Sequence, residues 1–287
     1  MASSSSGQRG AVLLLTVLVI LIVASLSFAV TLLNHALQAA APEAKTVQAY
    51  SNLEKAFARF VTSNRRLPCG ADGRIASTVA SAGVEQRNNT TGDCITVNFG
   101  VVPWITLQIA EADASDGWGN RLTYRVPTGA AGFTRNRAFD MSSCAATGTA
   151  ATTVSGGAVV CFPRAFPCAI AASCTNVTNY VLNRGIRVND ATGAPITNPA
   201  TGTGAAYIVT SAGANFFGAY NSGGLLMVVQ GSAAGTGEVT NSNNNPLQAA
   251  YVDSACDTSA TATHYDDVML RPAIASVLTQ AQLGPRP

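Results

Sequence analysis

The sequence predicts an α+β protein in which one long amino-terminal helix packs against a mainly antiparallel β-sheet head with disulfide-stapled loops. Three observations lead to this prediction. An uncharged apolar run passes directly into an amphipathic helical pattern over residues 10–64. All seven cysteines follow the apolar run. Short segments of alternating apolar and polar residues, which are typical of half-buried strands, also follow it.

The apolar run covers residues 11–33. Its only polar side chains are serines and threonines, and no formal charge lies between Arg9 and Glu43. A helix of this length is about 35 Å long, which is enough to cross a hydrocarbon core of about 30 Å. Because lipid offers no hydrogen bonds to the backbone, we expect this segment to span a membrane as a helix. Arg9 before it, with Asn34 and His35 after it, favours a cytoplasmic amino terminus.

Helical spacing continues beyond the apolar run. Apolar residues recur every three or four positions, with charged and amide side chains between them. Pro42 is expected to kink the helix, or to end it so that a second helix starts. Ser63 and Asn64 are expected to end the pattern, because Leu67-Pro68 follows closely. The apolar positions are Val47, Tyr50, Leu53, Phe57, Phe60 and Val61.

Three interpretations of this amino-terminal segment remain open. A cleaved secretory signal would use the small residues at 39–41, although the apolar run is longer than the usual ~7 to 15 residues of such signals. An uncleaved signal anchor is the second interpretation. The third uses the polar leader, residues 1–10: a cut after Gly10 would leave Ala11 and the apolar run at a new amino terminus.

The charge of the predicted head, residues 65–287, limits its partners. It contains 13 arginines, no lysine and 13 carboxylates, so its net charge is zero. The formal net charge of +2 of the whole chain therefore comes from the amino-terminal helix. A neutral head lacks the broad basic surface with which proteins bind nucleic acid, so no nucleic-acid partner is expected.

Motifs of catalysis are absent from the sequence. We find no Gly-x-Ser-x-Gly nucleophile elbow, no phosphate-binding loop and no Gly-x-Gly-x-x-Gly fingerprint, so we expect no catalytic residues and no enzyme. His264 beside Asp266 and Asp267 is the one cluster that suggests acid and base chemistry. We interpret it as a surface turn before a strand at 268–270. Residues 231–245 are expected to form a polar loop.

The cysteines indicate an oxidising compartment. A head carried across a membrane keeps disulfides, and an odd number of cysteines leaves one thiol free or joined to another molecule. We expect Cys69 to pair with Cys94. A zinc site is not expected, because no Cys-x-x-Cys occurs and the two histidines lie at opposite ends of the chain. Spacing assigns no partner to Cys144, Cys161, Cys168, Cys174 or Cys256.

The leader resembles the class III leader of type IV pilins and type II secretion pseudopilins. Gln8-Arg9-Gly10 stands directly before the apolar run. In that family a prepilin peptidase cleaves after the glycine and methylates the new amino terminus, here Ala11. A long helix, here residues 11–64, then serves as membrane anchor and filament core. Leu15 stands where the family usually has a glutamate, a departure that resembles minor subunits located at the filament tip.

Motifs of the head resemble one pseudopilin-like group. They are, in order, Leu-Pro-Cys-x-Ala-Asp-Gly from Leu67, Val-Pro-Trp-x-Thr-Leu from Val102, and Asp-x-Trp-Gly-Asn-x-Leu-x-Tyr from Asp116. The resemblance implies a structural turn that contains Asp116, Trp118, Gly119 and Asn120. It also implies that Trp118 packs the sheet against the helix.

The same resemblance suggests one metal. Major pseudopilins bind calcium through a carboxylate-rich loop near the carboxyl end. Asp266 and Asp267 are the candidate ligands here, and Asp253 and Asp257 are further sources of oxygen. No ligand spacing supports this hypothesis, and no other cofactor is expected.

The resemblance implies a structural subunit, a pseudopilin or minor pilin, of a type II secretion or type IV pilus filament. Its expected partners are other such subunits through the amino-terminal helix, the prepilin peptidase and the inner membrane. It implies a single-pass protein of the bacterial inner membrane with its head in the periplasm, and later a place in the filament or at the cell surface. The alternative is a membrane-anchored periplasmic adhesin or binding domain that does not assemble.

Overall fold

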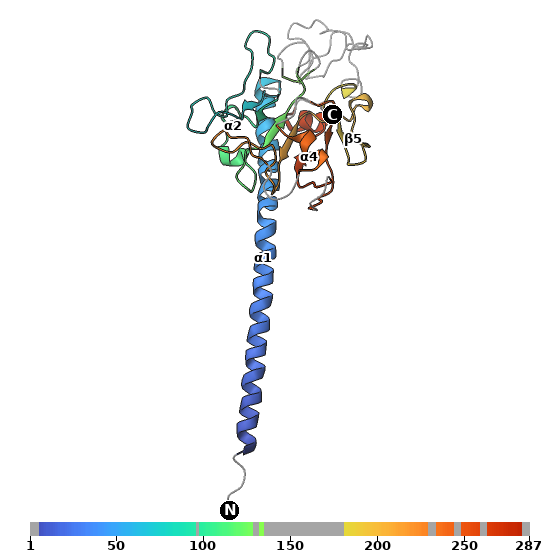
Figure 1. Cartoon of the computed structure of the whole chain (residues 1–287). Coiled ribbons are helices and arrows are strands. Elements are labelled where there is room, and N and C mark those ends of the chain that lie inside the picture. The colour runs from blue at the N-terminus through green and yellow to red at the C-terminus, as the bar shows by residue number, and fades with distance from the viewer. Residues whose placement is uncertain are drawn as a thin grey trace, which may run out of the picture. The chain divides into compact units, whose positions relative to one another are not determined.

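The computed structural model describes residues 6–95, 98–128, 132–134, 181–228, 234–243, 248–258 and 263–282. The chain divides into two compact units, Met1–Ala44 and Lys45–Pro287. Helix α1 (Ser6–Asn64) supplies the described part of the first unit and the beginning of the second, and Figure 1 shows it with the labelled elements α2, α4 and β5. Among the residues so described, no helix is long and apolar enough to cross a membrane. The membrane span expected over 11–33 stays a prediction.

Helix α1 does not end at Pro42, which was one of the two outcomes expected there. It continues through this residue and ends at Asn64, as predicted. A proline removes one backbone donor, and a helix of this length keeps many other hydrogen bonds on both sides of it.

The second unit buries one face of α1. Leu53, Phe57 and Val61 are fully buried at helical spacing. The ring of Phe57 lies 5.1 Å from that of Tyr124 and 4.4 Å from that of Tyr207, measured between centroids. Val47 is 58% exposed, so its predicted place on the apolar face is wrong. At about 100° per residue it falls to the side of the stripe that the other positions form.

The main sheet has five strands in the order β1-β2-β3-β6-β8, and each neighbouring pair is antiparallel. This confirms the predicted α+β class and the antiparallel sheet. The predicted strand at 268–270 is present. The five strands are β1 (Ala71–Asp72), β2 (Gly100–Val101), β3 (Thr123–Arg125), β6 (Ile208–Ser211) and β8 (Val268–Leu270).

A smaller sheet and several short helices complete the described part of the second unit. The smaller sheet has the order β5-β4-β7, with one antiparallel and one parallel pair. Its strands are β4 (Val188–Asn189), β5 (Pro195–Thr197) and β7 (Tyr251–Val252). The helices are α2 (Trp104–Leu107), η1 (Glu111–Ala114), η3 (Pro199–Thr201), α4 (Thr236–Asn241) and α5 (Ile274–Gln280).

A disulfide joins Cys69 to Cys94, as predicted. It connects the segment that leaves α1 to the loop before β2. Glu85 supports the same corner, because its carboxylate accepts hydrogen bonds from Arg66 at 2.6 and 2.8 Å and from the Cys69 backbone at 2.9 Å. Cys256 is exposed. Cys144, Cys161, Cys168 and Cys174 lie outside the described residues.

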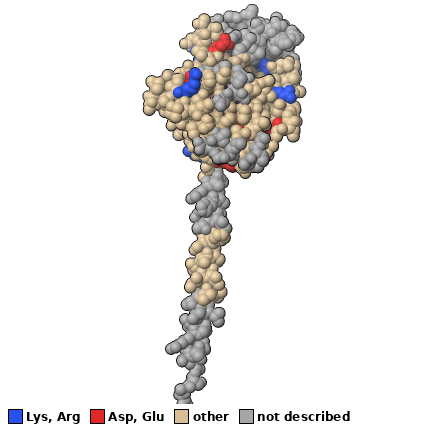
Figure 2. Space-filling view, in the orientation of Figure 1, with Lys and Arg blue, Asp and Glu red and all other residues tan. Residues whose placement is uncertain are grey.

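The surface of the second unit carries few charges. On the face seen in Figure 2, the described arginines, lysines and carboxylates are scattered among uncharged side chains. This distribution agrees with the low charged fraction of the sequence, 11%. The absence of a nucleic-acid partner stays a prediction.

Candidate functional site

The residues predicted to form a structural turn lie together at the end of the 3-10 helix η1. The Asp116 carboxylate is buried, and its Oδ1 accepts hydrogen bonds from the backbone of Trp118 at 3.0 Å and of Asn120 at 2.9 Å. Gly119 has a φ of +88°, a left-handed conformation that favours glycine. These contacts explain why aspartate and glycine stand at these positions of the turn.

The same turn connects the sheet to α1. Oδ2 of Asp116 accepts a hydrogen bond from Ser211 Oγ at 2.8 Å, and the backbone of Gly117 donates to Thr46 Oγ1 of α1 at 2.9 Å. Burial raises the pKa of the Asp116 carboxyl, and the hydrogen bonds that it accepts from the Asn120 backbone, the Ser211 hydroxyl and the Trp118 backbone oppose that shift. The side chain of Trp118 is only partly buried and is not part of the core cluster. The packing role expected of Trp118 stays a prediction.

Tyr50 of α1 bonds two strands of the main sheet at once. Its hydroxyl accepts from the backbone N–H of Ser211 in β6 at 2.9 Å and donates to the carbonyl of Val268 in β8. Ser211 and Val268 face each other in the register of these strands. Burial raises the pKa of Tyr50, so the phenol keeps the proton that it donates. The sequence predicts Tyr50 as an apolar contact only, and its hydroxyl was missed.

We expect Tyr50→Phe to destabilise the protein by about 1.5 to 3 kcal/mol, because a buried N–H and a partly buried carbonyl both lose the hydroxyl that bonds them. Urea unfolding followed by circular dichroism measures this. Tyr220→Phe is the matched control, since within the described part of the chain the Tyr220 hydroxyl makes no hydrogen bond. It should cost less than about 0.5 kcal/mol. Equal losses in the two variants would contradict the role given to the Tyr50 hydroxyl.

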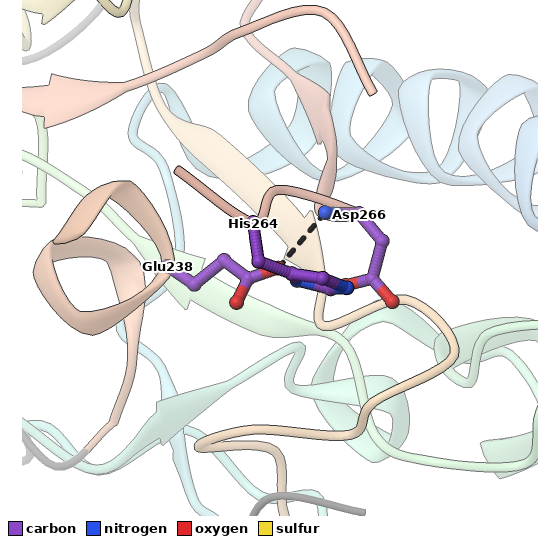
Figure 3. A group of neighbouring side chains, drawn as sticks. All are labelled: Glu238, His264 and Asp266. Carbon is purple, nitrogen blue, oxygen red and sulfur yellow. Dashed lines mark hydrogen bonds and ion pairs between the residues drawn. The ribbon is translucent and has the colours of Figure 1, made fainter. Parts of the chain in front are cut away.

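A cluster of titratable side chains lies elsewhere in the second unit, at the start of α4 (Figure 3). Glu238 stands in the first turn of this helix, while His264 and Asp266 lie in the segment just before β8. One ligand-type atom from each lies within 4.8 Å of the others. His264 Nδ1 is 2.9 Å from Glu238 Oε1, so we assign the Nδ1 proton to a hydrogen bond with that carboxylate.

Backbone and amide donors hold the two carboxylates of this cluster in place. Glu238 accepts from Asn215 Nδ2 at 2.9 Å, from the Gly235 backbone at 3.1 Å and from the Asp266 backbone at 2.8 Å. Asp266 Oδ2 accepts from the backbones of Ala214 and Asn215 at 2.9 and 3.0 Å. Burial, and then the neighbouring Glu238, raises the pKa of Asp266 to about 6.

The structure corrects the interpretation of His264 and Asp267 as a surface turn. His264 is buried against Glu238. Asp267 is also buried, and its carboxylate accepts a hydrogen bond from Asn241 Nδ2 at 2.9 Å. The residues between 231 and 245 were expected to form a loop, but they contain α4. The sequence offered one signal for the start of α4. In Gly-Thr-Gly-Glu at 235–238, the glutamate stands at the third position of the helix.

The ligands expected for calcium are not gathered together. Among the described residues, the structure forms one group of three possible metal ligands, and Asp266 is its only member from the expected set. Asp253 pairs with Arg271, Asp257 accepts from Thr263, and Asp267 bonds Asn241. Because the group includes an imidazole, it does not fit calcium, which takes oxygen ligands.

Comparison of the chain with protein-family models, with curated proteins and with solved structures found no match. A functional conclusion therefore depends on the sequence motifs and on the contacts described above.

Proposed function

We propose that this protein is a structural subunit, a pseudopilin or minor pilin, of a type II secretion or type IV pilus filament, and that it assembles through α1. The observation that carries the proposal is the difference between the two parts of this helix. In the second unit one face of α1 is buried in the core. In the first unit the described apolar side chains are exposed, for example Leu21 at 62% and Phe28 at 66%.

Such a surface needs an external partner. Soluble monomers rarely expose contiguous apolar patches larger than a few hundred Å². Lipid covers an apolar helix before assembly, and the helices of like subunits cover it in a filament. The same segment can therefore store the subunit in the inner membrane and later form the filament core. The large exposed side chains of this segment are Leu15, Val17, Leu18, Val19, Ile20, Leu21, Ile22, Val23, Leu26, Phe28 and Val30.

The contacts of the second unit suit a subunit that is held by its helix. Tyr50 and Thr46 tie α1 to β6, to β8 and to the turn at Gly117. Any force on the helix then reaches the sheet through buried and partly buried hydrogen bonds as well as through the apolar core. Leu15 in place of the usual glutamate supports a minor or tip subunit, since the expected pairing of that carboxylate with a neighbouring terminal amine is lost.

Gly10→Ala tests the proposal. If a prepilin peptidase cleaves after Gly10, the variant should stay at full length in the membrane and lose incorporation into filaments. The measurement is immunoblotting of membrane and sheared filament fractions from the native host. The physical reason is that alanine removes the conformational freedom that glycine gives the backbone at the proposed cut.

Gly7→Ala is the control, because it changes a glycine of the same leader three residues before the cut. It should be processed and assembled like the wild type. If Gly10→Ala behaves in the same way, the chain is a simple membrane-anchored domain, and the adhesin or binding-domain alternative is favoured instead.

A further inference from the structure

The cluster of Glu238, His264 and Asp266 contains a buried carboxylate oxygen that no described residue satisfies. Oδ1 of Asp266 is buried and, among the residues that the structure describes, has no hydrogen-bond partner. Within the described part of the chain, no lysine or arginine bonds or pairs with any of the three side chains. Burial of charge without a partner is costly, so such groups take a proton or coordinate a metal ion.

The three side chains converge from two separate segments. His264 and Asp266 are two residues apart, and alternate residues of an extended segment point to the same side. Glu238 reaches them from α4, and Figure 3 shows the three side chains pointing toward one another. Glu238 is fixed by Asn215 and by backbone donors, and backbone donors also hold Asp266. Outer contacts of this kind orient ligands before an ion binds.

We propose that Glu238, His264 and Asp266 bind one divalent transition-metal ion of the zinc class. One imidazole with two carboxylates suits such ions, and a water molecule would complete four-coordination. The ion takes the place of the proton between His264 Nδ1 and Glu238 Oε1, which are 2.9 Å apart. Two ligand atoms on tetrahedral zinc lie about 3.3 Å apart, so this pair has to open by only about 0.4 Å.

The proposed ion would have a structural role. It would join α4 to the segment that enters β8, the edge strand of the main sheet that receives the Tyr50 hydrogen bond. An ion that binds the folded head and not the unfolded chain stabilises the folded state. This inference is independent of the proposed function, since it concerns the second unit alone and applies equally to an anchored domain.

Metal binding by the full chain in detergent micelles tests the proposal. The protein is stripped with EDTA, dialysed, and titrated with zinc chloride or calcium chloride in a calorimeter. We expect one zinc ion per chain. At a zinc concentration about 100-fold above Kd, the midpoint of thermal unfolding should rise by about 5 to 10 °C. Calcium should produce no such rise. Absence of zinc binding, or a preference for calcium, would overturn the proposal.

Two variants locate the site. Asp266→Asn should weaken zinc binding at least tenfold, while its metal-free unfolding midpoint should be equal to or above that of the wild type, because a neutral amide replaces a carboxylate that has one buried, unsatisfied oxygen. Asp267→Asn changes the next carboxylate along the chain, which bonds Asn241, and should leave the zinc affinity unchanged. Zinc affinity that is unchanged in Asp266→Asn would place the ion elsewhere and overturn the assignment.

A spectroscopic readout keeps the test decisive if a variant does not fold. Cobalt(II) in a four-coordinate site of nitrogen and oxygen ligands absorbs visible light far more strongly than aqueous cobalt(II). The stripped wild-type chain should gain this absorption with one equivalent of cobalt chloride, and zinc should displace it. A spectrum equal to that of aqueous cobalt would contradict the proposed ligand set.

Discussion

Arg121→Lys is expected to destabilise the protein by about 3 to 5 kcal/mol. Only 1% of the Arg121 side chain is exposed, and its guanidinium is hydrogen-bonded through all three nitrogens. It also lies 4.8 Å from the ring of Trp104. Its hydrogen-bond acceptors are Glu111 Oε1, Ser77 Oγ and the carbonyls of Gly73, Ile75 and Ser222.

The ammonium of lysine can still pair with Glu111. It cannot also reach the acceptors that the other two nitrogens of the planar guanidinium bond. The carbonyls of Gly73 and Ile75 then lose their guanidinium donor, and each loss costs about 1 to 3 kcal/mol. The measurement is urea unfolding, read as a lower midpoint at unchanged slope. Arg74→Lys is the matched control, since Arg74 pairs with Asp72 and its side chain is 53% exposed. That variant should lose less than about 1 kcal/mol, and an equal loss at both sites would refute the argument.

Phe57→Ala is expected to cost about 3 to 5 kcal/mol. The side chain is fully buried between α1 and the sheet, where its ring contacts the rings of Tyr124 and Tyr207. Truncation removes a large apolar surface and leaves a cavity that two rigid rings cannot refill. It also removes two aromatic pairs that each contribute about 0.5 to 1.5 kcal/mol beyond burial.

Urea unfolding followed by near-ultraviolet circular dichroism measures this loss of stability. The signal comes from aromatic side chains in fixed surroundings, and Tyr124 and Tyr207 should lose theirs in the variant. Val47→Ala is the control on the same helix. Val47 is 58% exposed, so the change should lie within about 0.5 kcal/mol of the wild type. A small loss in Phe57→Ala would mean that α1 is not a structural part of the head core.

Periodicity predicts the part of the fold that depends on local sequence. Leu53, Phe57 and Val61 repeat at helical spacing, so the buried face of α1 follows from the sequence. Strand β8 and helix α5 also fall where apolar segments stand near the carboxyl end. The pairing of β3 with β6 and of β6 with β8 does not follow, because nothing in strands of three or four residues encodes their partners.

The candidate site was only partly predictable for the same reason. His264 and Asp266 are two residues apart in the sequence and were identified as part of one cluster, but Glu238 comes from a six-residue helix with a glycine inside it. Glycine lowers helix propensity, so that segment was interpreted as a loop. The role of Arg121 was missed because its acceptors are mostly backbone carbonyls. Every residue type has such a carbonyl, so the sequence does not indicate which of them Arg121 bonds.

The central claim is that the chain is processed as a prepilin and assembles through α1. The mass of the amino-terminal peptide of the protein purified from its native host tests this most directly. We predict a peptide that begins at Ala11 and carries one added methyl group. A peptide that begins at Met1 would contradict the account and identify a simple membrane anchor, and one that begins near Pro42 would identify a secreted protein.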